Sequence, residues 1–341
     1  MENHDLEAAI RDGTLGTLPP ESLTPGRFLA PNAAGNTPLH LAAKHGRLTE
    51  VPAEVLTSEA LLTKNDAGYT PLHHAALAGH LDQVPRARLA LDALGVRSNA
   101  GLTVFHLAAA NGHLDQIPAE LVTVDVVLRK TDVGNTLLHE AAENGGLDRI
   151  PAGFMTTGNL GLKNLGGETV LHLAAFNGNL SQVPASLLTA AALREMTSAG
   201  DTVFHAAAIS GHLEQIPVEQ LTHDHLVMAS KSGFTTIHAA AESGQLNKIP
   251  GAQLTADLLL TRNDNGDTPL HAAAYAGHLD QVPREVLTRE NVATRNYDGA
   301  TVAQTAMDSG HHRQIPEAVR PRGMNAFRRF LHNLGKSKAP F

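Results

Sequence analysis

Apolar residues recur along this chain in blocks of 33, each block with the same polar residues around them. In Gly35–Pro52 the block reads GNTPLHLAAKHGRLTEVP. A histidine occupies the same position in eight blocks: His40, His73, His106, His139, His172, His205, His238 and His271. Gln304 occupies this position in the ninth block. A constant period of this length is typical of stacked structural repeats, each of which contacts only its neighbours. We therefore predict a repeat protein.

The first half of each block predicts a short helix. Thr37 can cap its first turn, and the next position, Pro38, needs no backbone N–H. Leu39 and Ala42 then lie on one helical face, and Gly46 suits the left-handed residue that ends a helix.

The second half of each block contains a proline at a constant place. Leu48 and Val51 have the spacing of a second short helix, but Pro52 cannot continue it without a clash. Residues 53–57 and 58–62 then suggest one or two further helical turns, and 64–68 form a polar loop. We expect the second helix to be shortened and followed by a small extra helical turn.

The order G-x-TPLH-x-AA-x-x-G-H-L resembles the ankyrin repeat, most closely at Gly266–Leu279, GDTPLHAAAYAGHL. The resemblance covers about residues 2–316 and implies an all-α, ankyrin-like α-solenoid of about nine stacked 33-residue helix-turn-helix repeats with terminal caps. The recurrent proline departs from the family, whose second helix is usually unbroken. We expect a truncated capping repeat at 1–34, eight full repeats at 35–298, a degenerate capping repeat at 299–320 and a basic amphipathic tail at 321–341.

Composition limits the compartment and the kinds of partner that we expect for this protein. The chain has 341 residues, no cysteine and a formal net charge of −8, so its fold does not depend on disulfides. We find no signal-peptide pattern and no apolar run long enough to span a membrane. These features predict a cytoplasmic, monomeric protein, and delivery into a host cell stays open. An acidic solenoid argues against nucleic acid as a partner.

The tail, 321–341, carries five basic residues and no acid. Met324, Phe327, Leu331 and Leu334 have the spacing of one helical face. We favour a capping helix on the last repeat. The alternatives are a membrane-surface anchor, a basic arm for an anionic partner, and an export signal such as bacterial ankyrin proteins carry.

No pattern of catalytic or metal-ligating residues stands out. The histidine spacing is too wide for one ion to bridge successive repeats, because stacked helices lie about 8–10 Å apart. In ankyrin repeats this histidine usually ties adjacent loops by hydrogen bonds. We find no phosphate-binding loop, nucleophile elbow or zinc motif. We therefore expect no cofactor, no metal and no enzymatic activity, while an enzyme with an unrecognised site stays an alternative.

The residues that break the repeat are the best candidates for function. In ankyrin proteins the loop before TPLH and the two residues between Ala-Ala and Gly line the concave side and contact partners. All three tyrosines of this chain occur in those places, and aromatic residues are typical of binding surfaces. The predicted partner-binding residues are Tyr69, Leu77, Leu102, Phe176, Ile209, Phe234, Tyr275 and Tyr297. Glu143, Glu242 and Asp267 border them. We expect a non-enzymatic scaffold, such as an adaptor or a bacterial effector, that binds a protein with a basic surface, whereas the tail could instead dock the protein on a membrane.

Overall fold

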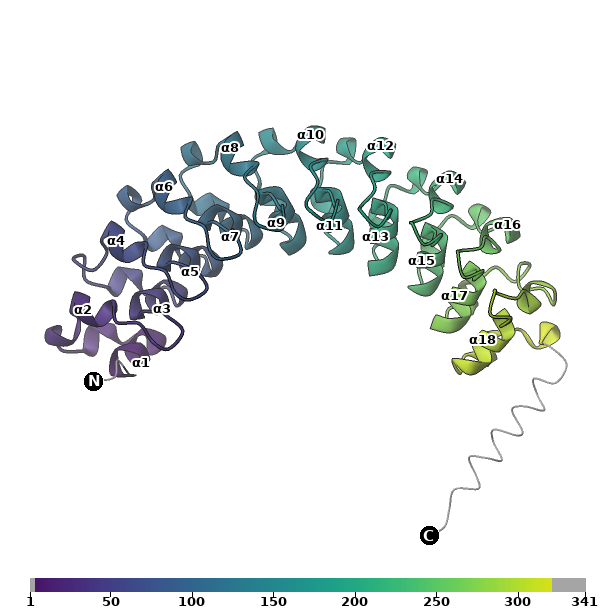
Figure 1. The fold of residues 1–341 in the computed structure, drawn as a ribbon, viewed down its shortest axis with the longest axis horizontal. Coiled ribbons are helices and arrows are strands. Elements are labelled where there is room, and N and C mark those ends of the chain that lie inside the picture. Colours follow the sequence, from purple (N-terminus) through teal and green to yellow (C-terminus); the bar gives the residue numbers. More distant parts are fainter. Residues whose placement is uncertain (1–3, 321–341) are drawn as a thin grey trace, which may run out of the picture. The chain divides into compact units, whose positions relative to one another are not determined.

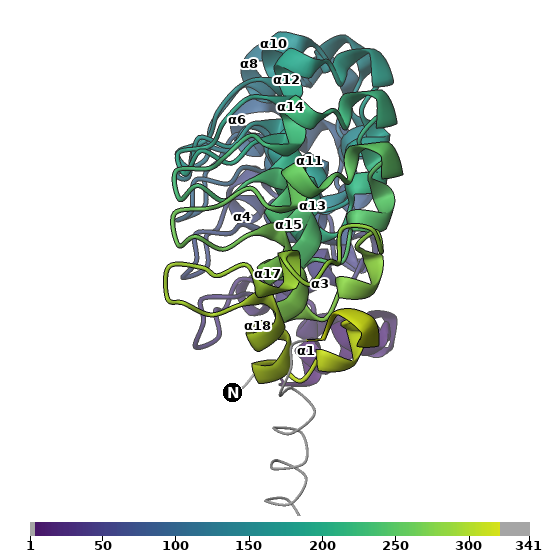
Figure 2. The same cartoon turned by 90° about the vertical axis from the view of Figure 1, so that its right-hand side faces the viewer.

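The computed structural model describes residues 4–320, so the predicted tail at 321–341 lies outside the described residues. The chain forms two compact units, Met1–Leu187 and Leu188–Phe341. In each unit a row of α-helices is covered on one side by short turns and helices, and the connecting loops lie on another side (Figures 1 and 2).

The row of α-helices contains the longest helix of each repeat, and we call these helices the inner helices. In the first unit they are α1 (His4–Asp12), α3 (Pro38–Lys44), α5 (Pro71–Ala78), α7 (Val104–Ala110), α9 (Leu137–Asn144) and α11 (Val170–Phe176). In the second unit they are α13 (Val203–Ser210), α15 (Thr236–Glu242), α17 (Pro269–Ala276) and α18 (Val302–Asp308). Within a unit each of these helices packs against the next.

These helices begin and end where the sequence predicts. The hydroxyl of Thr70 accepts a hydrogen bond from the backbone N–H of His73, and Pro71 fills the first position of α5. Gly79 ends the helix with φ of 76°, in the left-handed region that only glycine enters at little cost. The leucine and the paired alanines on the predicted face, such as Leu72 and Ala75, are fully buried.

The second half of each repeat is built of turns, as the recurrent proline predicts. A three-residue 3-10 turn takes the place of the second helix: η1 (Leu15–Thr17), η3 (Leu48–Glu50), η4 (Leu81–Gln83), η6 (Leu114–Gln116), η8 (Leu147–Arg149), η10 (Leu180–Gln182), η12 (Leu213–Gln215), η14 (Leu246–Lys248), η16 (Leu279–Gln281) and η18 (His312–Gln314). The second helix is thus shorter than we expected, because no α-helical turn remains there in residues 4–320.

A second set of turns follows the proline. The 3-10 turns are η2 (Pro20–Ser22), η5 (Arg86–Arg88), η7 (Ala119–Leu121), η9 (Ala152–Phe154), η11 (Ala185–Leu187), η13 (Val218–Gln220), η15 (Gly251–Gln253) and η19 (Glu317–Val319). One-turn helices come next: α2 (Pro25–Phe28), α4 (Ser58–Leu61), α6 (Leu91–Leu94), α8 (Val124–Val127), α10 (Thr157–Leu160), α12 (Ala190–Leu193), α14 (His223–Leu226) and α16 (Ala256–Leu259), with η17 (Asn291–Ala293) in the last such place. Residues 4–320 contain no strand, only isolated β-bridges, so each unit is an all-α solenoid.

The recurrent histidine joins each repeat to the next. In α5 the backbone N–H of Thr70 donates to Nδ1 of His73 over 3.1 Å. Nδ1 must therefore be the unprotonated nitrogen, which leaves the proton on Nε2. Nε2 then donates to the carbonyl of Leu102, one repeat later, over 3.3 Å. His106 is an exception in the place of its acceptor, because its Nε2 donates to the backbone carbonyl of Arg129 over 3.0 Å.

These histidines are neutral in the folded protein. Burial lowers the pKa of His73 to about 4 and that of His106 to about 4. Burial likewise lowers the pKa of five further histidines of the series: His40, His139, His205, His238 and His271. A proton on Nδ1 would also oppose the N–H of the capping threonine, so protonation breaks the bond from that N–H to the imidazole.

The first prediction concerns the proline. Pro151 has φ of −54° and ψ of 130°, values that proline adopts without strain. Pro151→Ala should lower the free energy of unfolding by about 0.5–1 kcal/mol, because it frees only the unfolded chain. Chemical denaturation measures this. A clear gain in stability together with greater far-UV helicity would instead show that the proline interrupts a latent helix.

The second prediction concerns acid. Between pH 6.5 and about 4 the unfolded chain binds more protons than the folded one, since the folded histidines keep the lower pKa. Stability should therefore be lost as the pH falls through this window, by about 1.4 kcal/mol per pH unit for each such histidine. Thermal unfolding at pH 7 and pH 5, followed by circular dichroism, measures the loss.

The matched variant for this test is His106→Gln, because the chain itself places glutamine in this position at Gln304. The variant should be less stable at pH 7 but should lose less stability on acidification than the parent protein. Equal melting temperatures of the parent at pH 7 and pH 5 would contradict the prediction.

Candidate functional site

A cavity of about 290 Å³ lies in the second unit, between the row of inner helices and the loops that precede them. Its lining comes from three successive repeats: Phe234, His238, Glu242, Asn263, Asp267, His271, Ala272, Tyr275, Asn296 and Thr305. The cavity is at the small end of the range that holds a drug-sized molecule. It suits one or two side chains of a partner.

Stacking in register brings the main residues of this cavity together. Phe234 and Asp267 each precede the capping threonine of an inner helix, and they are 33 residues apart. Glu242 and Tyr275 hold equivalent places near the ends of α15 and α17, again 33 residues apart. Since α15 packs against α17, two aromatic and two acidic side chains line one cavity.

The loop that carries Asp267 is held by two asparagines. Asn263 accepts hydrogen bonds at Oδ1 from the backbone N–H of Asn265, over 3.0 Å, and of Asp267, over 2.9 Å. Asn296, from the loop that leads into α18, donates from Nδ2 to Oδ1 of Asp267 over 2.8 Å. Gly266 makes the turn with φ of 73°. The Asp267 carboxylate is therefore fixed through Oδ1, and Oδ2 can accept a hydrogen bond from a ligand.

The two histidines of the cavity are already engaged. Nδ1 of His238 and Nδ1 of His271 accept from the backbone N–H of their capping threonines. Their Nε2 atoms donate to the backbone carbonyls of Asp267, over 3.0 Å, and of Ala300, over 3.2 Å. Burial lowers the pKa of both imidazoles, so they are uncharged at neutral pH. Across residues 4–320 no three histidine or acidic side chains are grouped to hold a metal ion.

The charge of the cavity is negative. Glu242 and Asp267 contribute two carboxylates, and the lining includes no lysine or arginine. Glu242 is exposed, whereas Asp267 and Phe234 are half-buried. Tyr275 is 65% exposed, and its ring is free to contact a ligand. Carboxylates beside aromatic faces favour a cation with an apolar stem, such as a lysine or arginine side chain.

Three of the predicted residues, one of them in the cavity, make contacts within the fold. The half-buried ring of Tyr69 packs against the rings of His73 and His74, with centroids 5.4 Å and 6.1 Å away. Leu102 is half-buried, and its carbonyl accepts the bond from His73. Phe234 combines both roles, because its ring lies 5.3 Å from that of His238 and also lines the cavity.

The remaining predicted residues are exposed but lie outside the cavity. Leu77, Phe176 and Ile209 are exposed at the ends of α5, α11 and α13. Tyr297 lies at a loop tip, 71% exposed, with the guanidinium of Arg262 5.9 Å from the centre of its ring. Of the eight predicted residues the structure thus brings two, Phe234 and Tyr275, to one cavity. Partner binding by all eight residues stays a prediction.

A larger hollow of about 620 Å³ lies in the first unit, among the turns η4, η5, η6 and η7. Its apolar lining, such as Leu89 and Ile117, is buried. Its arginines are engaged, because Arg86 pairs with Glu120 over 2.9 Å and Arg149 donates to the carbonyl of Gly112. We regard the smaller cavity as the better candidate, since it joins two carboxylates to the exposed ring of Tyr275.

The sequence analysis did not select Asn263 or Asn296, which shape the cavity. A signal was present, because Asn65, Asn164, Asn263 and Asn296 share one position of the repeat. The first two also donate from Nδ2 to an asparagine 29 residues earlier, over 2.8 Å and 3.0 Å.

Comparison with known proteins gives a consistent result. A model described as "Ankyrin repeats (3 copies)" matches residues 21–85 and 157–251, and a model described as "Ankyrin repeat" matches residues 265–296. A search of curated protein sequences returned no match. No helix within residues 4–320 has the length and apolar character needed to cross a membrane. Because the matched segments cover more than half of the sequence and the repeats stack as helices throughout, the chain belongs to the ankyrin repeat family.

Proposed function

We propose that this protein is a non-enzymatic scaffold that binds a partner protein on the inner helices and loops of its second unit, where the cavity takes a basic side chain of the partner. Ankyrin repeats are generally protein–protein interaction modules, and proteins built from them are typically not enzymes. The observation that carries the proposal is the cavity that unites Phe234 and Tyr275 with Glu242 and Asp267.

The chemistry of the cavity favours lysine or arginine over other residues. A cation placed over the face of an aromatic ring gains about 0.5–2 kcal/mol, and its apolar stem can cover the half-buried ring of Phe234. Oδ2 of Asp267 and the exposed carboxylate of Glu242 can accept hydrogen bonds from the charged head. The net charge of −8 would also speed the encounter with a basic partner.

The third prediction tests this site with peptides. Random twelve-residue peptides selected on the full chain should be enriched in lysine or arginine beside an apolar residue. Tyr275→Ala should weaken binding of the selected peptides by about 1–3 kcal/mol, as expected of an aromatic anchor. Glu242→Gln should weaken it by about 1 kcal/mol. Fluorescence anisotropy gives the dissociation constants.

Matched controls separate the cavity from the rest of the second unit. Glu285→Gln makes the same charge change at an exposed site outside the cavity, and Val218→Ala truncates a side chain that is 61% exposed elsewhere. Both should bind the peptides normally. Peptides that bind Tyr275→Ala and Glu242→Gln as well as the parent protein would overturn the proposal. Loss of binding in Asp115→Asn alone would place the site at the hollow of the first unit.

A further inference from the structure

A row of basic side chains crosses the loops of the first unit. Lys64, Arg97, Lys130 and Lys163 occupy the same position in four successive repeats, and we call these four residues the basic row. All four are exposed. The row is a local departure in a protein whose net charge is −8.

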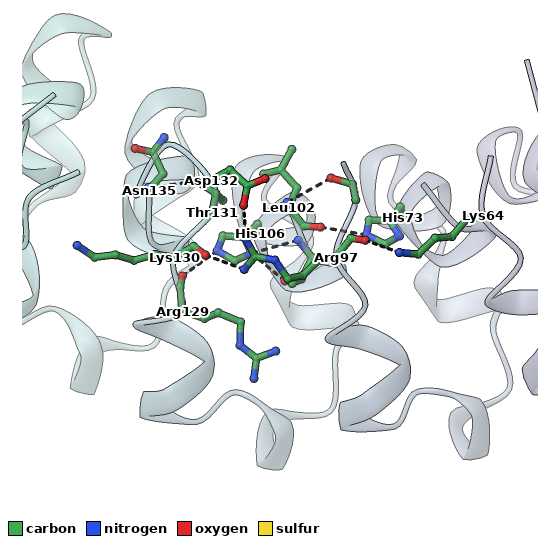
Figure 3. Close-up of polar contacts among 12 residues, drawn as sticks. Lys64, His73, Arg97, Leu102, His106, Arg129, Lys130, Thr131, Asp132 and Asn135 are labelled. Carbon is green, nitrogen blue, oxygen red and sulfur yellow. Dashed lines mark hydrogen bonds and ion pairs between the residues drawn. The ribbon is translucent and has the colours of Figure 1, made fainter. Parts of the chain in front are cut away.

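The side chains of the row are held by the main chain of the following repeat. Nζ of Lys64 donates to the carbonyl of Arg97 over 2.8 Å, Arg97 donates to the carbonyl of Lys130 over 2.9 Å, and Lys130 donates to that of Lys163 over 2.8 Å. Figure 3 shows Lys64 and Arg97 pointing along the row, each toward the next repeat. The charges are therefore fixed in place before any ligand arrives, which lowers the entropy cost of binding.

The fold does not require a basic residue at this position. Met196 and Ala229 occupy it in two repeats of the second unit, and Arg262 and Arg295 occupy it in the other two. The loops of Met196 and Ala229 make the same turn, with φ of 86° at Gly200 and 70° at Gly233. The hydrogen bond to the next loop is thus dispensable, and the charge in the first unit needs another explanation.

The row keeps capacity for a ligand. An ammonium group has three N–H donors, and Lys64 and Lys130 each spend one on a carbonyl. Arg97 also pairs with Asp132 over 2.6 Å, while its side chain remains 42% exposed. Arg129, half-buried beside Lys130, adds a further positive charge next to the row.

We propose that the basic row binds an acidic, extended segment of a partner protein, with carboxylates at every third residue. Stacked repeats are about 8–10 Å apart, and a segment in the extended polyproline II conformation advances about 3.1 Å per residue with three residues per turn, so every third side chain lies on the same face. Three residues of the segment therefore span one repeat, and about ten residues span the row. This surface lies in the first unit and does not depend on the function proposed for the second.

The same loops fit nucleic acid poorly. Single strands bind by stacking bases on aromatic rings, and the only aromatic residue in the four loops is Tyr69, whose ring packs against that of His73. Asp66 and Asp132 are exposed beside the row and would repel phosphates. An acidic polypeptide can place its carboxylates on the basic groups and its uncharged residues beside these acids.

The fourth prediction uses two synthetic ten-residue peptides of equal composition. Both contain four glutamates among glycine and serine; one has glutamate at every third position, and the other has the four glutamates in one block. The full chain should bind the spaced peptide about fivefold more tightly, because only this peptide meets one basic residue per repeat. Raising the salt concentration should weaken both complexes.

The variant Lys64→Gln with Lys130→Gln removes two charges and keeps an N–H donor at each place. It should bind the spaced peptide about tenfold more weakly, as expected for two exposed ion pairs, with little change in melting temperature. Lys248→Gln removes the same kind of charge from an exposed turn of the second unit and should change nothing.

Several results would overturn the proposal. They are equal affinity for the two peptides, unchanged affinity of the Lys64/Lys130 variant, tighter binding of a ten-nucleotide thymidine strand than of the spaced peptide, and no binding at about millimolar peptide. Each leaves the cavity of the second unit untested, so the two proposals fail separately.

Discussion

Each repeat depends on one imidazole that makes two kinds of contact at once. Because a backbone N–H of the capping threonine donates to Nδ1, the proton must sit on Nε2, and only that tautomer can donate to the loop of the next repeat. The tautomer that caps the helix is therefore the same one that bonds to the next repeat, so helix capping and the contact between repeats depend on each other. This constraint also keeps the histidines uncharged, as their lowered pKa values reflect. Because the histidines are uncharged, the carboxylates of Glu242 and Asp267 determine the charge of the cavity.

The recurrent proline determines the backbone conformation of the second half of each repeat, whose turns form the outer layer of the fold. A residue such as Val84 is buried in extended conformation just before Pro85, which begins a new turn with φ of −52°. Apolar side chains still reach the core from this layer, for example Leu81 and Leu94, both fully buried. The outer layer thus keeps the core of a helical repeat while its backbone is mostly turn. Stability in such an array comes from the contacts between neighbouring repeats more than from any one element.

The sequence predicted the parts of the structure that every repeat shares. The capping threonine, the left-handed glycine and the role of the histidine are all confirmed, because local backbone chemistry decides them. The sequence could not show which of the few aromatic rings are available to a ligand, because the exposure of a ring depends on neighbours about 33 residues away. Tyr69 packs on histidine rings and Tyr297 lies beside Arg262, whereas Tyr275 lines a cavity. The sequence analysis did not predict the basic row, because a single lysine in a polar loop is common, although the spacing of 33 residues between its four members is present in the sequence.

Surfaces on this fold are best understood position by position through successive repeats. Residues 33 apart become neighbours, so a site arises where one position of the repeat carries similar chemistry several times, or where two adjacent positions complement each other. The basic row is of the first kind, and the cavity around Phe234 and Tyr275 is of the second. The charges of the two surfaces are opposite, because the row carries lysine and arginine whereas the cavity carries Glu242 and Asp267. On the two proposals made above, an acidic segment would suit the row and a basic side chain the cavity, so the two surfaces would select different partners, or differently charged parts of one partner.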